Sequence, residues 1–149
     1  KQTVEGLAAL KLPPGTSITN PVDAPVGTLQ QEDGRVAEKI LEAIYGSGRP
    51  DALVMHLNLS AFAGRTKAEV LDNLVQAALR VQARYSGQAH FVLVLRSDGE
   101  PALEERKRAF RARAAALGIP VYDEIANAGA ALAALAFHER FVHSRSRNA

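Results

Sequence analysis

Two polar side chains that could bind a ligand lie in a proline-rich segment, Asn20-Pro21-Val22-Asp23-Ala24-Pro25. Each proline fixes its own φ and drives the residue before it towards extended backbone. Asn20 and Asp23 are therefore expected on a stiff support, with side-chain oxygens that accept hydrogen bonds. Two interpretations stay open: these side chains cap local backbone N–H groups, as in many turns, or they serve a ligand or an interface.

This segment belongs to a longer stretch, residues 11–32, that has neither helical nor strand periodicity. Compact domains rarely contain so long an irregular connection unless it is functional or disordered. Ile18 and Val22 can anchor the stretch on a hydrophobic core, so we expect it to be ordered.

A second group of candidates follows the predicted strands, because ligands of open parallel sheets bind beyond the carboxyl ends of the strands. Residues 58–65, 96–99 and 122–124 occupy those positions, and Asn58 and Ser60 are the binding candidates among them. Small residues and helix N-termini at this edge could receive an anion. We favour the alternative, in which these segments are ordinary strand-to-helix turns.

The four histidines are poorly placed for catalysis. His56 and His90 fall inside predicted strands, where a hydrogen-bonded structural role is expected. His138 and His143 fall on the last predicted helix or its exposed end. No two histidines have metal-ligand spacing, the sequence has no P-loop and no H-E-x-x-H motif, and no serine has a G-x-S-x-G context. We therefore predict neither a catalytic residue nor a metal site in this chain.

Composition indicates one globular domain with a sizeable core, since 47% of the 149 residues are hydrophobic and 23% are charged. The absence of cysteine excludes disulfides and thiolate chemistry, and it is compatible with a cytoplasmic location. No apolar run reaches membrane-span length and no leader sequence is recognisable, so no membrane association is predicted. The small excess of 18 basic over 16 acidic residues does not suggest a nucleic-acid partner. The chain starts with Lys1, so we expect a piece of a longer polypeptide.

Hydrophobic periodicity and turn residues predict the elements that must position these candidates. We expect Asp33 to be an N-cap, a Thr66–Glu69 capping box, Pro101 at the first position of a helix in which Leu117 faces inward, and Asp123 as the last N-cap. The predicted elements are helices at 3–10, 33–45, 66–85, 101–117 and 123–141, strands at 52–57, 90–95 and 119–122, and a flexible tail at 144–149.

Strands that alternate with helices predict a three-layer α/β domain, in which helices flank a parallel sheet. The strands at 52–57 and 90–95 are apolar almost throughout, which is typical of strands buried on both faces. Three strands are few for this architecture, and their edge would be apolar and unpaired. We expect strands upstream of Lys1, or another chain, to cover that edge.

Residues 12–23, Leu-Pro-Pro-Gly followed by Thr-Ser-Ile-Thr-Asn-Pro-Val-Asp, resemble the "LP…NPVD" signature of the NDP-forming acyl-CoA synthetases, relatives of succinyl-CoA synthetase. Residues 3–7, 49–55 and 118–123 are similar to further segments of that family in the same order. The resemblance covers nearly the whole chain, and NPVD with its Leu-Pro prelude is its specific part. The chain departs from many relatives at Ala24-Pro25, where they continue with Leu and a glycine-rich stretch.

The resemblance implies the second half of a flavodoxin-like ligase domain, truncated at the N-terminus. The family interconverts a carboxylic acid, CoA and a nucleoside triphosphate with an acyl-CoA, through an acyl phosphate and a phosphohistidine. That histidine lies in a motif on another domain, so no histidine of this chain inherits its role. CoA and ATP with Mg are expected for the full enzyme but not on this chain, and the CoA-binding and ATP-grasp domains are the expected partners. Asn20, Pro21, Val22 and Asp23 would form a loop near the phosphohistidine.

The predicted function is therefore that of a ligase domain that helps to form the docking site of the phosphohistidine. The alternative is a non-catalytic flavodoxin-like module for binding or assembly. A stand-alone flavodoxin or receiver-like domain is disfavoured, because no Thr/Gly-rich phosphate loop follows a first strand and no acidic cluster ends one.

Overall fold

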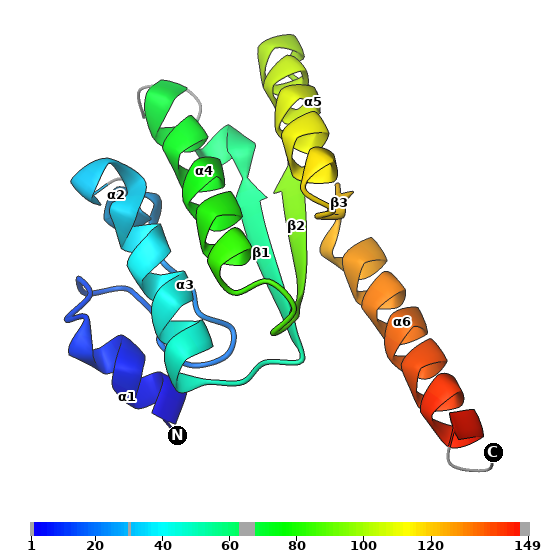
Figure 1. The fold of residues 1–149 in the computed structure, drawn as a ribbon. Helices are drawn as coiled ribbons and strands as arrows, with labels where there is room; N and C mark the ends of the chain where they lie inside the picture. Colours follow the sequence, from blue (N-terminus) through cyan, green and yellow to red (C-terminus); the bar gives the residue numbers. More distant parts are fainter. Residues whose placement is uncertain (1, 30, 63–67, 147–149) are drawn as a thin grey trace.

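The computed structural model describes residues 2–29, 31–62 and 68–146 as a sheet between two layers of helices (Figure 1). The elements in chain order are α1 (Gln2–Ala9), α2 (Val26–Leu29), the 3-10 helix η1 (Gln31–Gly34), α3 (Arg35–Ser47), β1 (Ala52–Asn58), the 3-10 helix η2 (Leu59–Ala61), α4 (Ala68–Arg84), β2 (His90–Arg96), α5 (Pro101–Ala116), β3 (Val121–Tyr122) and α6 (Ile125–Ser146).

The three strands form a parallel sheet in the order β1-β2-β3, which confirms the predicted α/β class and strand direction. β1 and β2 pair over their full lengths, from Ala52 opposite His90 to Asn58 opposite Arg96. β3 contributes only two residues. Within the described residues β1 pairs with β2 alone, so one of its edges is free.

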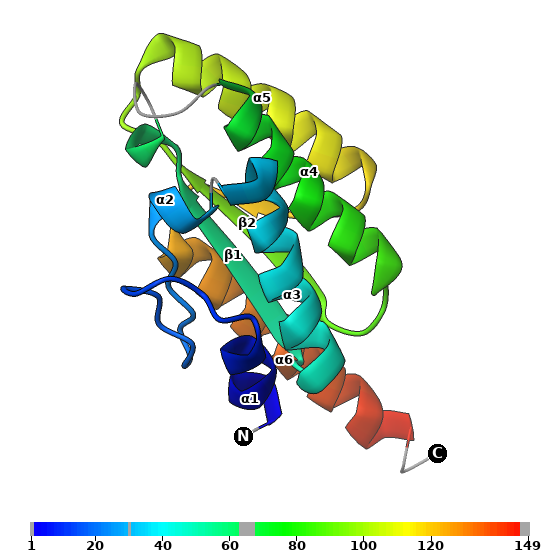
Figure 2. The same cartoon turned by 90° about the vertical axis from the view of Figure 1, so that its left-hand side faces the viewer.

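Helices cover the two faces of the sheet unequally (Figures 1 and 2). On one face, α3, α4 and α5 bury the main core, in which Leu74, Leu93 and Phe110 are almost fully enclosed. On the other face lies α6, where Val92 and Val94 of β2 pack against Ala128. None of the helices in the described part of the chain is long and apolar enough to cross a membrane.

The expectation that both long strands are buried on both faces is right for β2 and wrong for β1. Residues 91–95 of β2 are all buried. In β1 burial alternates, so that Leu53 and Leu57 are buried whereas Val54 is 40% exposed and His56 is exposed. Because β1 lies at the edge, α6 covers its neighbour and leaves much of this face of β1 open.

Several predicted helix ends need correction. Asp33 is not an N-cap: its φ is 55°, in a left-handed turn, and Gly34 precedes α3. Gly34 has φ 87° and an added Cβ would lie 3.4 Å from the Asn73 Cβ, so a glycine suits both the turn and the approach to α4. Pro101 does begin α5.

At the other end of α5, Leu117 is 59% exposed rather than inward, because it follows the last helical residue. Asp123 does not cap α6, since its carboxylate binds basic groups of α5 instead. α6 continues to Ser146, beyond the predicted end near Phe141. Thr66 and Lys67 of the predicted capping box lie outside the described residues.

Candidate functional site

The segment that carries Asn20 and Asp23 is folded into a closed turn, residues 17–25, which we call the proline turn. The backbone N–H of Ser17 donates to the Asp23 carbonyl over 2.8 Å, and the Asp23 N–H donates to the Ser17 carbonyl over 3.1 Å. The Ser17 hydroxyl donates to the Pro21 carbonyl over 3.3 Å, and the Asn20–Pro21 peptide bond is cis. These contacts hold Asn20 and Asp23 on an ordered support.

Apolar side chains anchor the proline turn, as expected from the sequence. Ile18 and Val22 pack against a small core formed by Leu7 of α1 together with Val36 and Ile40 of α3. α1 itself lies close to α3, as Gly6 shows: a Cβ added there would lie 2.7 Å from the Ser47 hydroxyl oxygen. The turn is therefore fixed to the two helices beside the free edge of β1.

The side chains of Asn20 and Asp23 are exposed and form no hydrogen bond with the described part of the chain. The Asp23 backbone closes the turn, and its carboxylate is left facing solvent. The interpretation in which these side chains cap local N–H groups therefore receives no support. Their role towards a ligand or an interface stays a prediction.

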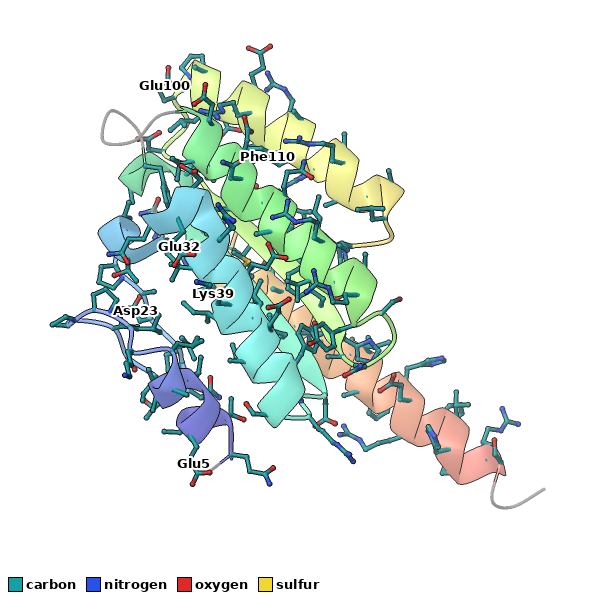
Figure 3. The ribbon with its side chains drawn as sticks, turned by 60° about the vertical axis from the view of Figure 1, so that its left-hand side comes forward. Glu5, Asp23, Glu32, Lys39, Glu100 and Phe110 are labelled. Atoms are coloured by element: carbon teal, nitrogen blue, oxygen red, sulfur yellow. The ribbon has the colours of Figure 1, made fainter. Side chains whose placement is uncertain are left out.

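A groove of about 560 Å³ runs between the proline turn and β1, and we call it the β1 groove. Residues 18–24 line one side, while α1, α3 and residues 52–57 of β1 line the rest. Arg49, Val54 and His56 are among its residues. Figure 3 shows Asp23 on the loop beside α1, apart from Glu100 at the start of α5. The groove thus joins the proline turn to the open side of β1.

Asn58 and Ser60 do not line the β1 groove, so the structure does not unite the six predicted binding residues. Asn58 is the last residue of β1 and is exposed. The Ser60 hydroxyl oxygen is buried and forms no hydrogen bond of normal geometry within the described residues. The pKa of the Asp98 carboxyl group is lowered mainly by the backbone N–H of Glu100, which donates to it over 3.1 Å. The Ser60 hydroxyl lies close enough to Asp98 to lower that pKa further.

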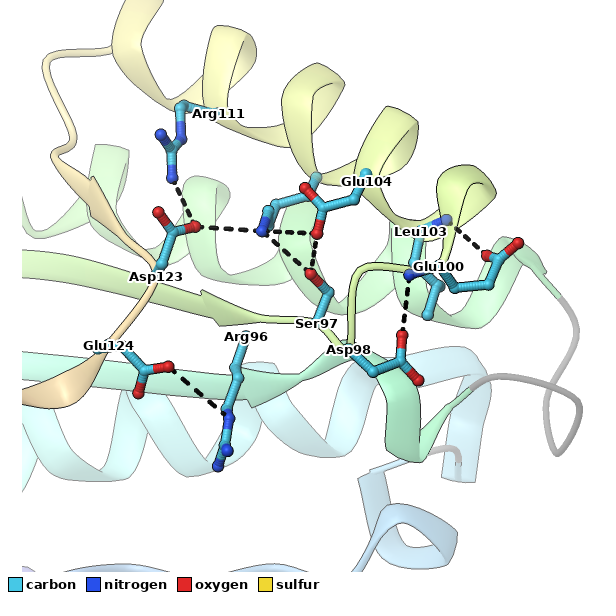
Figure 4. Close-up of polar contacts among 10 residues, drawn as sticks. Arg96, Ser97, Asp98, Glu100, Leu103, Glu104, Arg111, Asp123 and Glu124 are labelled. Atoms are coloured by element: carbon cyan, nitrogen blue, oxygen red, sulfur yellow. Dashed lines mark hydrogen bonds and ion pairs between the residues drawn. The ribbon is translucent and has the colours of Figure 1, made fainter.

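A network of polar side chains lies at the carboxyl ends of β2 and β3 (Figure 4). Lys107 of α5 lies at its centre and donates to Ser97 over 3.0 Å and to Glu104 over 2.8 Å. It also pairs with Asp123 over 3.2 Å, and Arg111 donates to the same carboxylate over 3.0 Å. Ser97 donates to Glu104 as well. We call these five residues the Lys107 network.

Hydrogen bonds from Lys107 lower the pKa of Glu104, with help from the Ser97 hydroxyl. Burial acts to raise the pKa of Asp123, but hydrogen bonds from Lys107 and Arg111 outweigh it and the pKa falls. Burial also acts to lower the pKa of Lys107, but hydrogen bonds to Glu104 and Asp123 outweigh it, so the pKa of Lys107 rises. Each of these shifts favours the charged form of its group, and the charged groups are paired with one another.

The N-terminus of α5 is occupied too, because the Glu100 carboxylate accepts the Leu103 N–H over 2.9 Å. An incoming anion would have to displace this carboxylate. The possibility of an anion site at this edge is not supported for α5, and ordinary turns remain the better interpretation.

The histidines divide differently from the prediction. His90 is hydrogen-bonded to Glu139 of α6 over 2.8 Å, as expected of a hydrogen-bonded histidine in a strand. His56 lies exposed in the β1 groove, and the structural role predicted for it is wrong. A period of two in β1, with His56 and Asn58 on one face and Leu53 and Leu57 on the other, is the signal that could have revealed this open face.

No group of three or more metal-ligating side chains occurs in residues 2–29, 31–62 and 68–146. Comparisons with models of protein families, with curated proteins and with solved structures found no match to this chain.

Proposed function

We propose that this chain is a flavodoxin-like domain of an NDP-forming acyl-CoA synthetase, and that the β1 groove receives the loop that carries the phosphohistidine. The observation that carries the proposal is the arrangement of the proline turn. Its backbone is closed and anchored, while Asn20 and Asp23 remain unpaired within the described residues at the rim of a groove. Such preorganisation is typical of docking sites, because it lowers the entropic cost of binding.

Each group at the groove has a role that suits its chemistry. Asp23 would repel a phosphate, so it orients the incoming loop by accepting hydrogen bonds from backbone N–H groups. Arg49 lines the same groove and supplies the positive charge that a phosphoryl group needs. The chain would bind neither CoA nor ATP with Mg itself. It would act together with CoA-binding and ATP-grasp domains in the cytoplasm.

We also propose that a neighbouring domain or subunit covers the free edge of β1. Val54 is exposed, and β1 pairs on one side only within the described residues. Native proteins rarely leave a flat apolar edge uncovered, because it can pair with other chains.

The test is acyl-CoA formation by the full-length polypeptide that contains this chain, with CoA, ATP–Mg and a panel of short carboxylic acids. We expect Asp23→Ala to lower turnover at least ten-fold with unchanged thermal unfolding. Glu5→Ala is the matched control, since it removes the same charge from α1 outside the groove. Normal turnover of Asp23→Ala would disprove the docking role.

The alternative is a non-catalytic module that uses the same groove for assembly. It is favoured by one observation: the described residues form a groove beside a free strand edge, and the groove lining is mostly apolar. If the wild-type polypeptide forms no acyl-CoA from any acid in the panel, the ligase proposal fails and this alternative replaces it.

A further inference from the structure

The apolar residues of α6 lie on two opposite sides of the helix. On the inner side, Ala128 and Leu132 pack against the sheet. On the outer side, spacings of three and four residues align six exposed residues on one face. We call this face the outer stripe, and its residues are Ala126, Ala130, Ala133, Ala134, Phe137 and Phe141.

The outer stripe contains two of the most exposed large apolar side chains of the described chain. Phe137 is 67% exposed and Phe141 is 50% exposed. Single exposed apolar residues are ordinary on protein surfaces, whereas two aromatic side chains on one continuous apolar face are typical of an interface. α6 lies along the sheet as far as Glu139, which is hydrogen-bonded to His90 of β2, and Figure 2 shows its last turns extending beyond the end of the sheet.

Side-chain size along the outer stripe indicates how a partner helix would lie. The first half is all alanine, and the second half carries the two phenylalanines. A parallel copy would set ring against ring at one end and leave a gap between alanines at the other. An antiparallel copy fits instead: in a single register Phe141 faces Ala126, Phe137 faces Ala130 and Ala133 faces Ala134. Large side chains then fill the space above small ones, as close packing requires.

Charge favours the same antiparallel arrangement. Acidic Glu124 precedes α6, and basic Arg140 and Arg145 lie in its last two turns, with Arg145 over the ring of Phe141. The acidic residue of those turns, Glu139, is already hydrogen-bonded to His90 of β2. Asp123 is already held by the Lys107 network, but the Glu124 side chain is 59% exposed, with Arg96 only at 3.9 Å. An antiparallel copy brings the acidic start of each helix to the basic end of the other, and it also opposes the two helix dipoles.

We propose that two copies of this chain associate through their outer stripes, as an antiparallel pair of α6 helices related by a two-fold axis near Ala133 and Ala134. A single helix pair lies at the small end of interface sizes, so the expected dissociation constant is on the order of micromolar. The inner side of α6 stays on its own sheet, and the β1 groove takes no part.

The first test is sedimentation equilibrium of the full-length polypeptide. We expect a dimer, and a dissociation constant raised at least ten-fold when Phe137→Ala and Phe141→Ala are combined. Leu117→Ala is the control, because it removes a side chain of similar exposure from the end of α5 and should leave the constant unchanged. A monomeric wild type, or a double variant that dimerises normally, would overturn the proposal.

The second test is cross-linking by introduced cysteines, since this chain contains none. Ala134→Cys should link to itself across the two-fold axis. Ala126→Cys and Phe141→Cys should each fail alone but link when mixed, because about 22 Å of helix separates the two positions. Mass spectrometry of the linked peptides assigns each link to α6. Self-linking of Ala126→Cys would indicate a parallel pair and contradict the proposal, as would a dimer without any α6 link.

Discussion

β1 and β2 are paired along their whole lengths, but they occupy different environments. Both faces of β2 are buried, one against α4 and α5 and the other against α6. β1 is buried only on the face that α3 and α4 cover. Val54 of β1 and Val92 of β2 are direct partners on the same face, yet Val54 is open and Val92 is 3% exposed.

The polar contacts of the two sides differ in the same way. On the β2 side, Lys107 is 14% exposed and holds several partners at once. On the β1 side, Lys39 binds Glu32 with both side chains about half exposed, at 48% and 49%. The difference teaches that the described sheet has one half with enclosed contacts, around β2, and one half that is open to solvent, around β1. The β1 groove lies on the open half.

The largest effect is expected from a charge placed on Val92, and the same change at its partner Val54 is the control. Val92→Asp buries a carboxylate between β2 and α6 without a partner, and should cost about 4 kcal/mol of unfolding free energy. Val54→Asp places the same group at an open position and should cost less than about 1 kcal/mol. Urea unfolding of this chain, followed by circular dichroism, measures both values.

The same two variants can also be compared in the longer polypeptide that contains this chain. There, Val54→Asp should become more costly if a neighbouring domain or subunit covers β1, while Val92→Asp should not change. Equal large costs in the short chain would show that β1 is not open, and the contrast between the strands would be lost.

An intermediate effect is expected from the two lysines. Lys107→Met removes the group that three partners share and leaves Glu104 and Asp123 with fewer hydrogen bonds, so it should cost about 1 kcal/mol. Lys39→Met breaks an exposed pair and should lower the free energy of unfolding by less than Lys107→Met does. If Lys39→Met lost more unfolding free energy than Lys107→Met, the contacts on the β1 side would be the stronger ones, and the contrast between the two sides would be reversed.

Much of the fold could be predicted, because helices and strands alternate with clear periods and turn residues. The parallel sheet, the limits of β1 and β2 to within one residue and the start of α5 at Pro101 all follow from such local signals. The open face of β1 could not be predicted in the same way. Val54 and Val92 are the same residue in similar apolar runs, and only the position of α6 across the sheet distinguishes them.

The candidate site was predictable in part for a similar reason. The prolines indicated an ordered turn, and Ile18 and Val22 indicated its anchor, because both are properties of the segment itself. Arg49 and His56 were missed as groove residues, since they join the proline turn only through tertiary packing. Asn58 and Ser60 were predicted from a general rule about the carboxyl ends of strands, and that rule does not say which strand end faces which loop.

The smallest effect is expected from pH. The pKa values of Glu104 and Asp123 lie below their usual values of 4.5 and 3.8, so the unfolded chain binds more protons than the folded chain in acid. Their contribution to stability is complete above those usual values and is lost as pH falls through the lowered ones. Thermal unfolding of the wild type between pH 6 and pH 3 should therefore show a decline that is shallower in Lys107→Met.

High salt distinguishes the acid decline that depends on Lys107 from the acid decline that depends on Lys39. Lys39 also lowers the pKa of Glu32, first through its hydrogen bond, so Lys39→Met should flatten the same acid decline. At about 1 M salt the screening length falls to about 3 Å, which removes most of the attraction between exposed charges but less of that between enclosed ones. The difference between wild type and Lys107→Met should persist in high salt, whereas that for Lys39→Met should vanish. If both differences vanish together, the Lys107 network is as open to solvent as the Lys39 pair, and the electrostatic half of the contrast between β1 and β2 does not hold.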